Sequence, residues 1–237
     1  MYGGVYIFPL LAQNLLGFSP TTTGLALMPG GLGTACTVLL CGVLTTKLRI
    51  DPRILIFTGI SIFAYSMWDL GHLSLQVGES EVFRGLLIRG LGLGFLFTPI
   101  NGVAFGTIDP KDAQQASSMV NLSRQLGGSF GLAFIGTYLN TQIQFHRVNL
   151  IGNIRESNPA FNLQLQGMTG TLTAHGYSQT DARHAALGVI AQSLQGQATM
   201  MSYNDCWLLI MVFFLVTSPA ILLLRKPRTS AAPAETH

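Results

Sequence analysis

The sequence predicts an all-α integral membrane protein with six transmembrane helices, and three features of composition and pattern lead to this prediction. Of its 237 residues, 49% are hydrophobic and only 10% are charged. A typical soluble domain has about 25% charged residues, so these few ionic groups could not cover a water-facing surface. Charge-free stretches recur along the chain, and a helix needs about 20 mainly apolar residues to cross a bilayer. This composition excludes disorder, a coiled coil and a nucleic-acid-binding domain, and it argues against a soluble enzyme.

The first two predicted helices precede Lys47, which is the first charged residue of the chain. They cover residues 1–16 and 24–46, and the segment 17–23 between them has the glycine, serine, proline and threonine residues of a turn. The first helix starts at the initiator methionine without a basic region before it, which is not the pattern of a secretory signal. We therefore expect a truncated or split polypeptide that begins inside a helix of a larger protein.

The next three predicted helices cover residues 53–70, 82–108 and 110–145. Asp-Pro pairs at 51–52 and 109–110 precede two of them. An aspartate cap followed by proline is typical of a helix N-terminus, because the carboxylate accepts backbone N–H bonds and the N–H that proline lacks is not needed there. The helix from Pro110 is too long for the bilayer, so we expect its ends to lie outside the lipid.

The sixth predicted helix covers residues 206–224, after a long polar connection over residues 146–205. Ser178 and Asp181 form a capping signal within this connection. The signal predicts a helix that lies against the bundle with a weakly apolar face. That face would consist of Ala182, Ala185, Ala186, Val189, Ile190 and Ser193. The sequence favours a surface decoration for this connection over a role in gating a ligand, although both remain open.

Orientation follows from the basic residues of the short connections, since cytoplasmic loops of membrane proteins are enriched in Lys and Arg. If six helices alternate in direction, one side of the membrane receives Lys47, Arg49, Arg53, Lys111, Arg225, Lys226 and Arg228. We therefore predict a multi-pass protein of a bacterial inner (plasma) membrane with both termini in the cytoplasm. Residues 1–228 would form the bundle, and 229–237 a disordered cytoplasmic tail.

A polar stripe on the fifth predicted helix is the first candidate site. It consists of Ser117, Asn121, Arg124 with Gln125, and Gly128, which share one helical face. Hydrocarbon offers no hydrogen bonds, so such a stripe must face protein or water. Arg124 lies about 21 Å along the helix from Asp109, and an embedded arginine costs at least about 2.5 kcal/mol. Two interpretations remain open for Arg124, which are lining a cavity and capping backbone carbonyls of a neighbouring helix.

The fourth predicted helix carries the second candidate group. Gly90 and Gly94 have the four-residue spacing that allows two helices to approach closely, and Pro99 frees a carbonyl and permits a kink. Arg89 lies about two turns from the outer end, so snorkelling to the surface and a functional role are both open. Asn101 is a further polar group on this helix. In the second predicted helix, Pro29 with its following glycines favours packing and bending.

Neither Asp, Glu nor His occurs in the middle of any predicted span. A proton-coupled carrier needs a group whose proton affinity is set by burial and neighbours, so its proton site would lie mostly elsewhere. The cysteines Cys36, Cys41 and Cys206 stand in apolar runs without metal-ligand spacing, and we interpret them as small buried hydrophobes. Hydrolase and metalloprotease motifs are missing as well, so we expect no enzyme activity and no metal.

Four segments together resemble a known family. They are residues 24–31, the basic turn with 51–53, residues 89–92 with Pro99, and residues 121–129. These segments look like those of multidrug efflux carriers of the EmrB/QacA type, which are fourteen-helix drug:proton antiporters of the major facilitator superfamily. The resemblance implies that this chain corresponds to helices nine to fourteen, the C-terminal bundle. The N-terminal bundle and the acidic coupling residues of the family are missing from it.

The resemblance implies export of hydrophobic, often cationic compounds through rocking of two bundles around a central cavity. It implies the proton gradient as energy source without a cofactor. The expected partners are the lipid bilayer, hydrophobic drugs and an N-terminal bundle in cis or trans, and not nucleic acid. The alternative is an inactive remnant or a non-transporting membrane subunit.

Residue roles follow from the same resemblance. Cavity or inter-bundle contacts are expected from Arg124, Asn121, Gln125, Asn101 and Arg89. Helix packing is expected from Gly90, Gly94, Gly127, Gly128, Gly131, Pro29 and Pro99. Because a guanidinium repels cations, we expect Arg124 to hold geometry or to meet a carboxylate of the missing half.

Overall fold

The computed structural model describes residues 2–48, 50–105, 108, 110–152 and 159–219, and over these residues the chain is helical with short connections. Four of the described helices are long and apolar enough to cross a membrane. They are α2 (Pro20–Thr46), α3 (Pro52–Leu70), α4 (Glu79–Phe105) and α7 (Gln179–Thr217). The all-helical membrane fold is thus confirmed, whereas a count of six spans is not.

The two remaining predicted spans differ from the expectation for different reasons. Helix α1 (Tyr2–Asn14) has 13 residues and rises only about 20 Å, which is less than the roughly 30 Å of hydrocarbon. It ends because Gly17 adopts a positive φ of 68° and the chain turns there. Helix α5 (Ala113–Ile151) has 39 residues, but polar side chains keep it below the hydropathy of a membrane span.

The expected helix starts can be compared with the observed caps. The Asp51 side chain accepts a hydrogen bond from the Arg53 N–H, as the Asp-Pro pair predicts. Helix α2 starts four residues earlier than expected, because Ser19 caps it by accepting from the Thr22 N–H while Pro20 occupies the first turn. The predicted Asp109 cap lies outside the described residues, and Pro110–Asp112 form a 3₁₀ turn before α5.

The stretch from 146 to 205, predicted as a polar connection with one helix in it, is mostly helical over its described residues, and its last helix runs on into the sixth predicted span. It contains the end of α5, helix α6 (Pro159–Ala174) and the first half of α7. Ser178 accepts from the Asp181 N–H, so the predicted cap is confirmed. The helix then continues into the last apolar segment, because no proline interrupts residues 179–217. The predicted tail at 229–237 lies outside the described residues.

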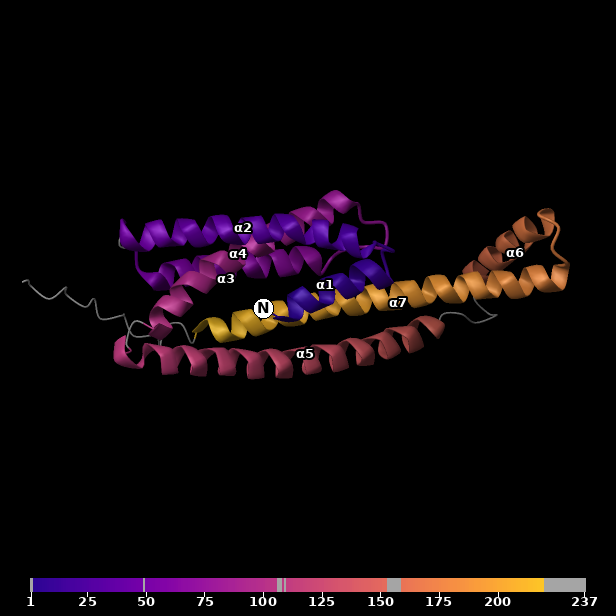
Figure 1. Ribbon diagram of the computed structural model, residues 1–237. Helices are drawn as coiled ribbons and strands as arrows, with labels where there is room; N and C mark the ends of the chain where they lie inside the picture. The colour runs from indigo at the N-terminus through magenta and orange to yellow at the C-terminus, as the bar shows by residue number, and fades with distance from the viewer. Residues whose placement is uncertain (1, 49, 106–107, 109, 153–158, 220–237) are drawn as a thin grey trace, which may run out of the picture.

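Helices α1, α2, α3, α4, α5 and α7 form a bundle in which their directions alternate (Figure 1). Helices α2, α3 and α4 pack together, while α5 and α7 run side by side as a long pair with α1 between the two groups. Helix α6 packs on the first half of α7, where this helix extends beyond the bundle. Helix α1 supplies much of the core, because the side chains of Ile7, Phe8 and Leu11 are fully buried there.

Candidate functional site

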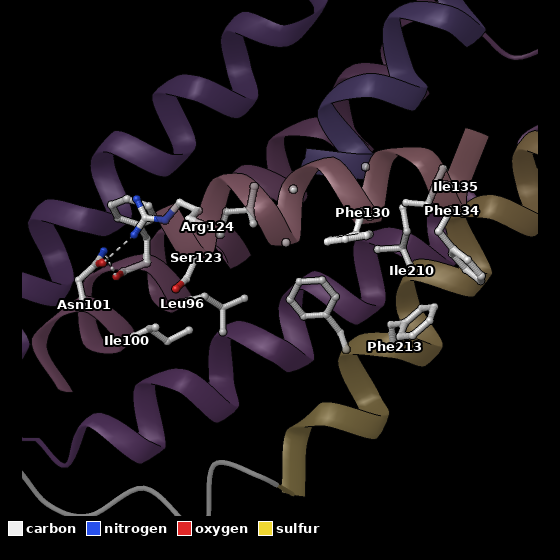
Figure 2. Close-up of a pocket in the computed structure, with 17 residues that line it drawn as sticks. Leu96, Ile100, Asn101, Ser123, Arg124, Phe130, Phe134, Ile135, Ile210 and Phe213 are labelled. Atoms are coloured by element: carbon white, nitrogen blue, oxygen red, sulfur yellow. Dashed lines mark hydrogen bonds between the residues drawn. The ribbon is translucent and has the colours of Figure 1, made fainter. Parts of the chain in front are cut away.

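A cavity of about 630 Å³ lies between α1, α4, α5 and α7 (Figure 2). Its size falls in the range of pockets that hold small molecules. Most of its wall is hydrocarbon, with aromatic rings from three of the helices. The lining consists of Gly3, Leu93, Leu96, Phe97, Ile100, Asn101, Ser123, Arg124, Gly127, Gly128, Phe130, Gly131, Phe134, Ile135, Ile210, Phe213 and Phe214.

One end of this pocket is polar. The Arg124 Nη2 atom of α5 donates a hydrogen bond of 3.0 Å to the Asn101 Oδ1 atom of α4 (Figure 2). The Arg124 guanidinium carbon also lies 5.3 Å from the centre of the Phe97 ring, which is within range of a cation–π contact. No described carboxylate pairs with Arg124. The pocket therefore combines an apolar body with a single cationic group at one end.

The structure places Arg124 on a pocket wall, where it bonds to a side-chain amide and, among the described residues, to no backbone carbonyl. Asn101 lies beside it and also donates from Nδ2 to the Phe97 carbonyl at 2.8 Å. Asn121 and Gln125 are exposed and do not line the pocket. A helix turns about 100° per residue, so Asn121 lies about 60° and Gln125 about 100° around α5 from Arg124. Both side chains therefore stand at the edge of the face that lines the pocket.

Arg89 does not reach the pocket, and it does not snorkel. Its side chain is only 6% exposed, and Nη1 donates a hydrogen bond of 2.7 Å to the backbone carbonyl of Gly4 in α1. Capping a carbonyl of a neighbouring helix was one interpretation of Arg124, and it is Arg89 that does so. No local sequence pattern indicates this pair, because the two residues are 85 positions apart.

The predicted packing residues fall into two groups. Gly90 and Gly94 lie where α4 meets α2, and a Cβ atom on Gly90 would overlap the Gly30 carbonyl. Thr34, which sequence reasoning missed, donates to the Gly90 carbonyl at 2.9 Å across the same contact. Pro29 and Pro99 lie inside α2 and α4.

The glycines of α5 do not pack as expected. A Cβ atom on Gly127 or Gly131 would meet no described atom within 4 Å, and both residues line the pocket. Gly128 is buried and lines it as well. Within the described part of the chain, these positions enlarge the pocket by their lack of a side chain, and Gly127 and Gly131 do not bring two helices together.

Other polar groups were placed wrongly or missed. Asp205 lies inside α7, where its Oδ2 atom is 2.6 Å from the His146 Nε2 atom of α5. Both had been assigned to the polar connection, and their separation of 59 residues hides the contact from local patterns. Cys36 is exposed on α2, whereas Cys41 and Cys206 are buried as expected.

Helices of this length and apolarity around a hydrophobic pocket define a multi-pass membrane protein that can hold small molecules between its helices. The family model described as Major Facilitator Superfamily matches residues 1–132, which is more than half of the chain. The chain therefore belongs to the major facilitator superfamily.

Three curated relatives narrow this comparison to transporters. The chain is 25% identical over 218 residues to the colistin resistance protein EmrB of Acinetobacter baumannii, covering 92% of this chain and 42% of the relative. It is 25% identical over 229 residues to the multidrug export protein EmrB of Escherichia coli, with coverage of 95% and 42%. A 34% identity to the drug efflux pump JefA of Mycobacterium tuberculosis covers 57% of this chain and 26% of that pump. The chain thus spans less than half the length of these relatives.

Proposed function

We propose that this chain is the C-terminal bundle of a proton-coupled multidrug efflux carrier, and that the α1–α4–α5–α7 pocket is its share of the substrate cavity. The observation that carries the proposal is the pocket itself, with its apolar walls and the Arg124–Asn101 bond at one end. The family membership and the names of the relatives support a transporter. Binding and release between helices need no covalent chemistry, and we propose no enzyme activity.

The proposal includes a second bundle, supplied in cis or in trans. Helix α5 carries the exposed polar side chains Asn121 and Gln125, and its apolar side chains Met119 and Leu122 are also exposed. Polar groups are costly in hydrocarbon, so this face requires protein or water. A bundle facing α5 would provide both the cover and the carboxylate that Arg124 lacks among the described residues. The relatives have more than twice the length of this chain, which is consistent with such a bundle.

The proposed placement is the bacterial inner membrane, with α5 and the shorter helix α1 as the two remaining membrane-embedded helices of the six. Helix α2 ends, α3 begins, α4 ends and α5 begins at one end of the bundle (Figure 1). The basic residues Lys47, Arg53 and Lys111 lie at these junctions. Cytoplasmic loops are enriched in Lys and Arg, which supports the cytoplasm as the location of this end of the bundle. With six alternating helices, both termini would lie on the same side.

In the proposed mechanism, hydrophobic compounds bind in the pocket while two bundles rock around it, and inward proton flow drives the cycle. Arg124 is repelled by cationic groups, so its proposed role is to hold the α4–α5 wall or to meet a carboxylate of the other bundle. The phenylalanine side chains of the pocket wall would contact the substrate, because burial of apolar area is non-directional and tolerates many shapes.

Dye efflux from cells that carry the chain together with an N-terminal bundle tests the proposal. We expect export that stops when a protonophore collapses the proton gradient. Arg124→Ala should abolish export at unchanged membrane levels, whereas Arg147→Ala, on the exposed side of the same helix, should not affect it. Unchanged export by Arg124→Ala would refute the role of the pocket. A complete pair of bundles without any export would favour the remnant or non-transporting subunit.

A further inference from the structure

Arg89 is a buried cation that the pocket does not use directly. Its side chain is 94% buried in the interior of α4, and no described carboxylate pairs with it. Nη1 bonds to the Gly4 carbonyl, while Nε has no hydrogen-bond partner among the described residues. A guanidinium is costly to bury with so few partners, so an arginine at this position needs a reason beyond filling space.

Gly4 is held between α4 and α7. A Cβ atom on Gly4 would lie 3.3 Å from the Arg89 Nη1 atom and 3.5 Å from the Trp207 Cζ3 atom. Trp207 is fully buried, and its ring packs against Gly4 beside the guanidinium. The first turn of α1 is thus fixed by one directional hydrogen bond and one flat ring.

The preceding residue, Gly3, belongs to the pocket wall. A Cβ atom there would overlap the Ile135 Cδ1 atom and lie 3.5 Å from the Ile210 Cδ1 atom, and all three residues line the pocket. Because Gly3 has no side chain, the backbone of α1 itself forms the pocket wall on this side. Any movement of α1 along its axis changes the space that a ligand can occupy.

We propose that Arg89 is a positioning residue. It lies outside the pocket and holds the first turn of α1 in place, so that Gly3 forms part of the pocket wall. Asn14 at the last turn of α1 hydrogen-bonds Tyr203, whereas the turns before it pack through apolar side chains such as Phe8 and Leu11. Apolar burial is non-directional, so the first turn needs its own directional contact. The charge-assisted bond to the Gly4 carbonyl supplies the direction. The ligand part of this inference rests on the proposed function, whereas the effect on α1 does not.

Trp207 can report the position of α1 without any ligand. The chain has two tryptophans, so a Trp68→Phe variant leaves Trp207 as the single emitter. With the full chain in lipid nanodiscs, we expect Arg89→Gln to increase quenching of Trp207 by acrylamide, and Arg89→Lys to restore protection. Arg84→Gln is the matched control, since Arg84 lies on the same helix but is mostly exposed and pairs with Asp69. Equal protection of Trp207 in Arg89→Gln and the unchanged protein would overturn the proposal.

A second measurement uses 1-aminoanthracene, a neutral tricyclic dye, and follows saturable energy transfer from Trp207. A hydrogen bond to a charged group is worth enough to change an equilibrium by about tenfold or more, so we expect Arg89→Gln to raise the Kd by about that factor. Arg89→Lys should recover most of the affinity, and Arg84→Gln should keep it. A role in stability alone would lower the melting temperature of Arg89→Gln and leave the dye affinity of the folded protein unchanged, which would refute the proposal.

The two measurements separate this inference from the proposed function. If the unchanged protein shows no saturable dye binding while Arg89→Gln exposes Trp207, the ligand pocket fails and the role of Arg89 in holding α1 stands. If the dye binds and neither Trp207 nor the affinity responds to Arg89→Gln, the pocket stands and the positioning role is wrong.

Discussion

Arg124 of α5 donates a hydrogen bond of 3.0 Å to Asn101 of α4, and this bond closes the polar end of the pocket. The guanidinium also lies over the Phe97 ring of the same helix α4. Arg124 therefore links α5 to α4 at the pocket through a hydrogen bond and a cation–π contact. Removing the acceptor should test the bridge without removing the charge.

We expect Asn101→Ala to destabilise the bundle by about 1.5–3 kcal/mol, because a hydrogen bond to a charged group is lost. Asn101→Asp should retain most of the stability, since a carboxylate also accepts from the guanidinium. Thermal unfolding of the chain in nanodiscs measures both variants. An Asn101→Ala protein that melts with the unchanged protein would show that the bond contributes nothing to the bundle.

The glycines of α5 give a prediction in which stability and binding change in opposite directions. Alanine is favoured over glycine in a helix by about 1 kcal/mol, and a methyl group on Gly127 or Gly131 meets no described atom. Gly127→Ala and Gly131→Ala should therefore raise the melting temperature. They should also weaken binding of 1-aminoanthracene about tenfold, since overfilling a site costs about 1–3 kcal/mol.

Gly136→Ala is the control for this pair, because Gly136 has the same open surroundings on α5 and does not line the pocket. It should stabilise the helix and leave dye binding unchanged. If Gly127→Ala instead lowers stability or membrane levels, the glycine packs against another helix, as the sequence first indicated.

Local patterns in the sequence were sufficient for several parts of the fold. The Asp51 cap, the Ser178 cap and the apolar helices α2, α3 and α4 follow from residues within one or two turns of each other. Arg124 was identified as a site residue because a charge deep in an apolar helix is costly wherever the helix packs.

The contacts that complete the site are long-range, and no local pattern contains them. Arg89 and Gly4 are 85 residues apart, and His146 and Asp205 are 59 residues apart. The polar composition before Asp205 also concealed that α7 is continuous, since periodicity is weak where many side chains are polar. Gly127 shows a second limit of sequence patterns. A glycine that lets two helices approach and a glycine that leaves room for a pocket can have the same spacing along a helix, so the pattern does not distinguish them.

The contact between α2 and α4 predicts a strong effect at one glycine and none at another. A Cβ atom on Gly90 would overlap the Gly30 carbonyl, which is backbone and cannot rotate away. We expect Gly90→Ala to destabilise the bundle by about 1–3 kcal/mol and to lower membrane levels. Gly102→Ala on the same helix should be neutral or stabilising, because its surroundings are open. Equal thermal stability of the two variants would contradict the close contact.

The cap of α7 gives a prediction outside the bundle. The Ser178 hydroxyl accepts from the Asp181 N–H at 3.2 Å and starts the helix that packs against α6. Ser178→Ala should destabilise this helix start by about 1 kcal/mol, and Ser178→Asp should preserve it, since aspartate is an equally good cap. Hydrogen exchange of the amides of residues 179–183 measures the effect, and exchange within the buried second half of α7 should stay unchanged. Because the first half of α7 extends beyond the bundle (Figure 1), faster exchange over the whole helix would show that the extension and the core unfold as one unit.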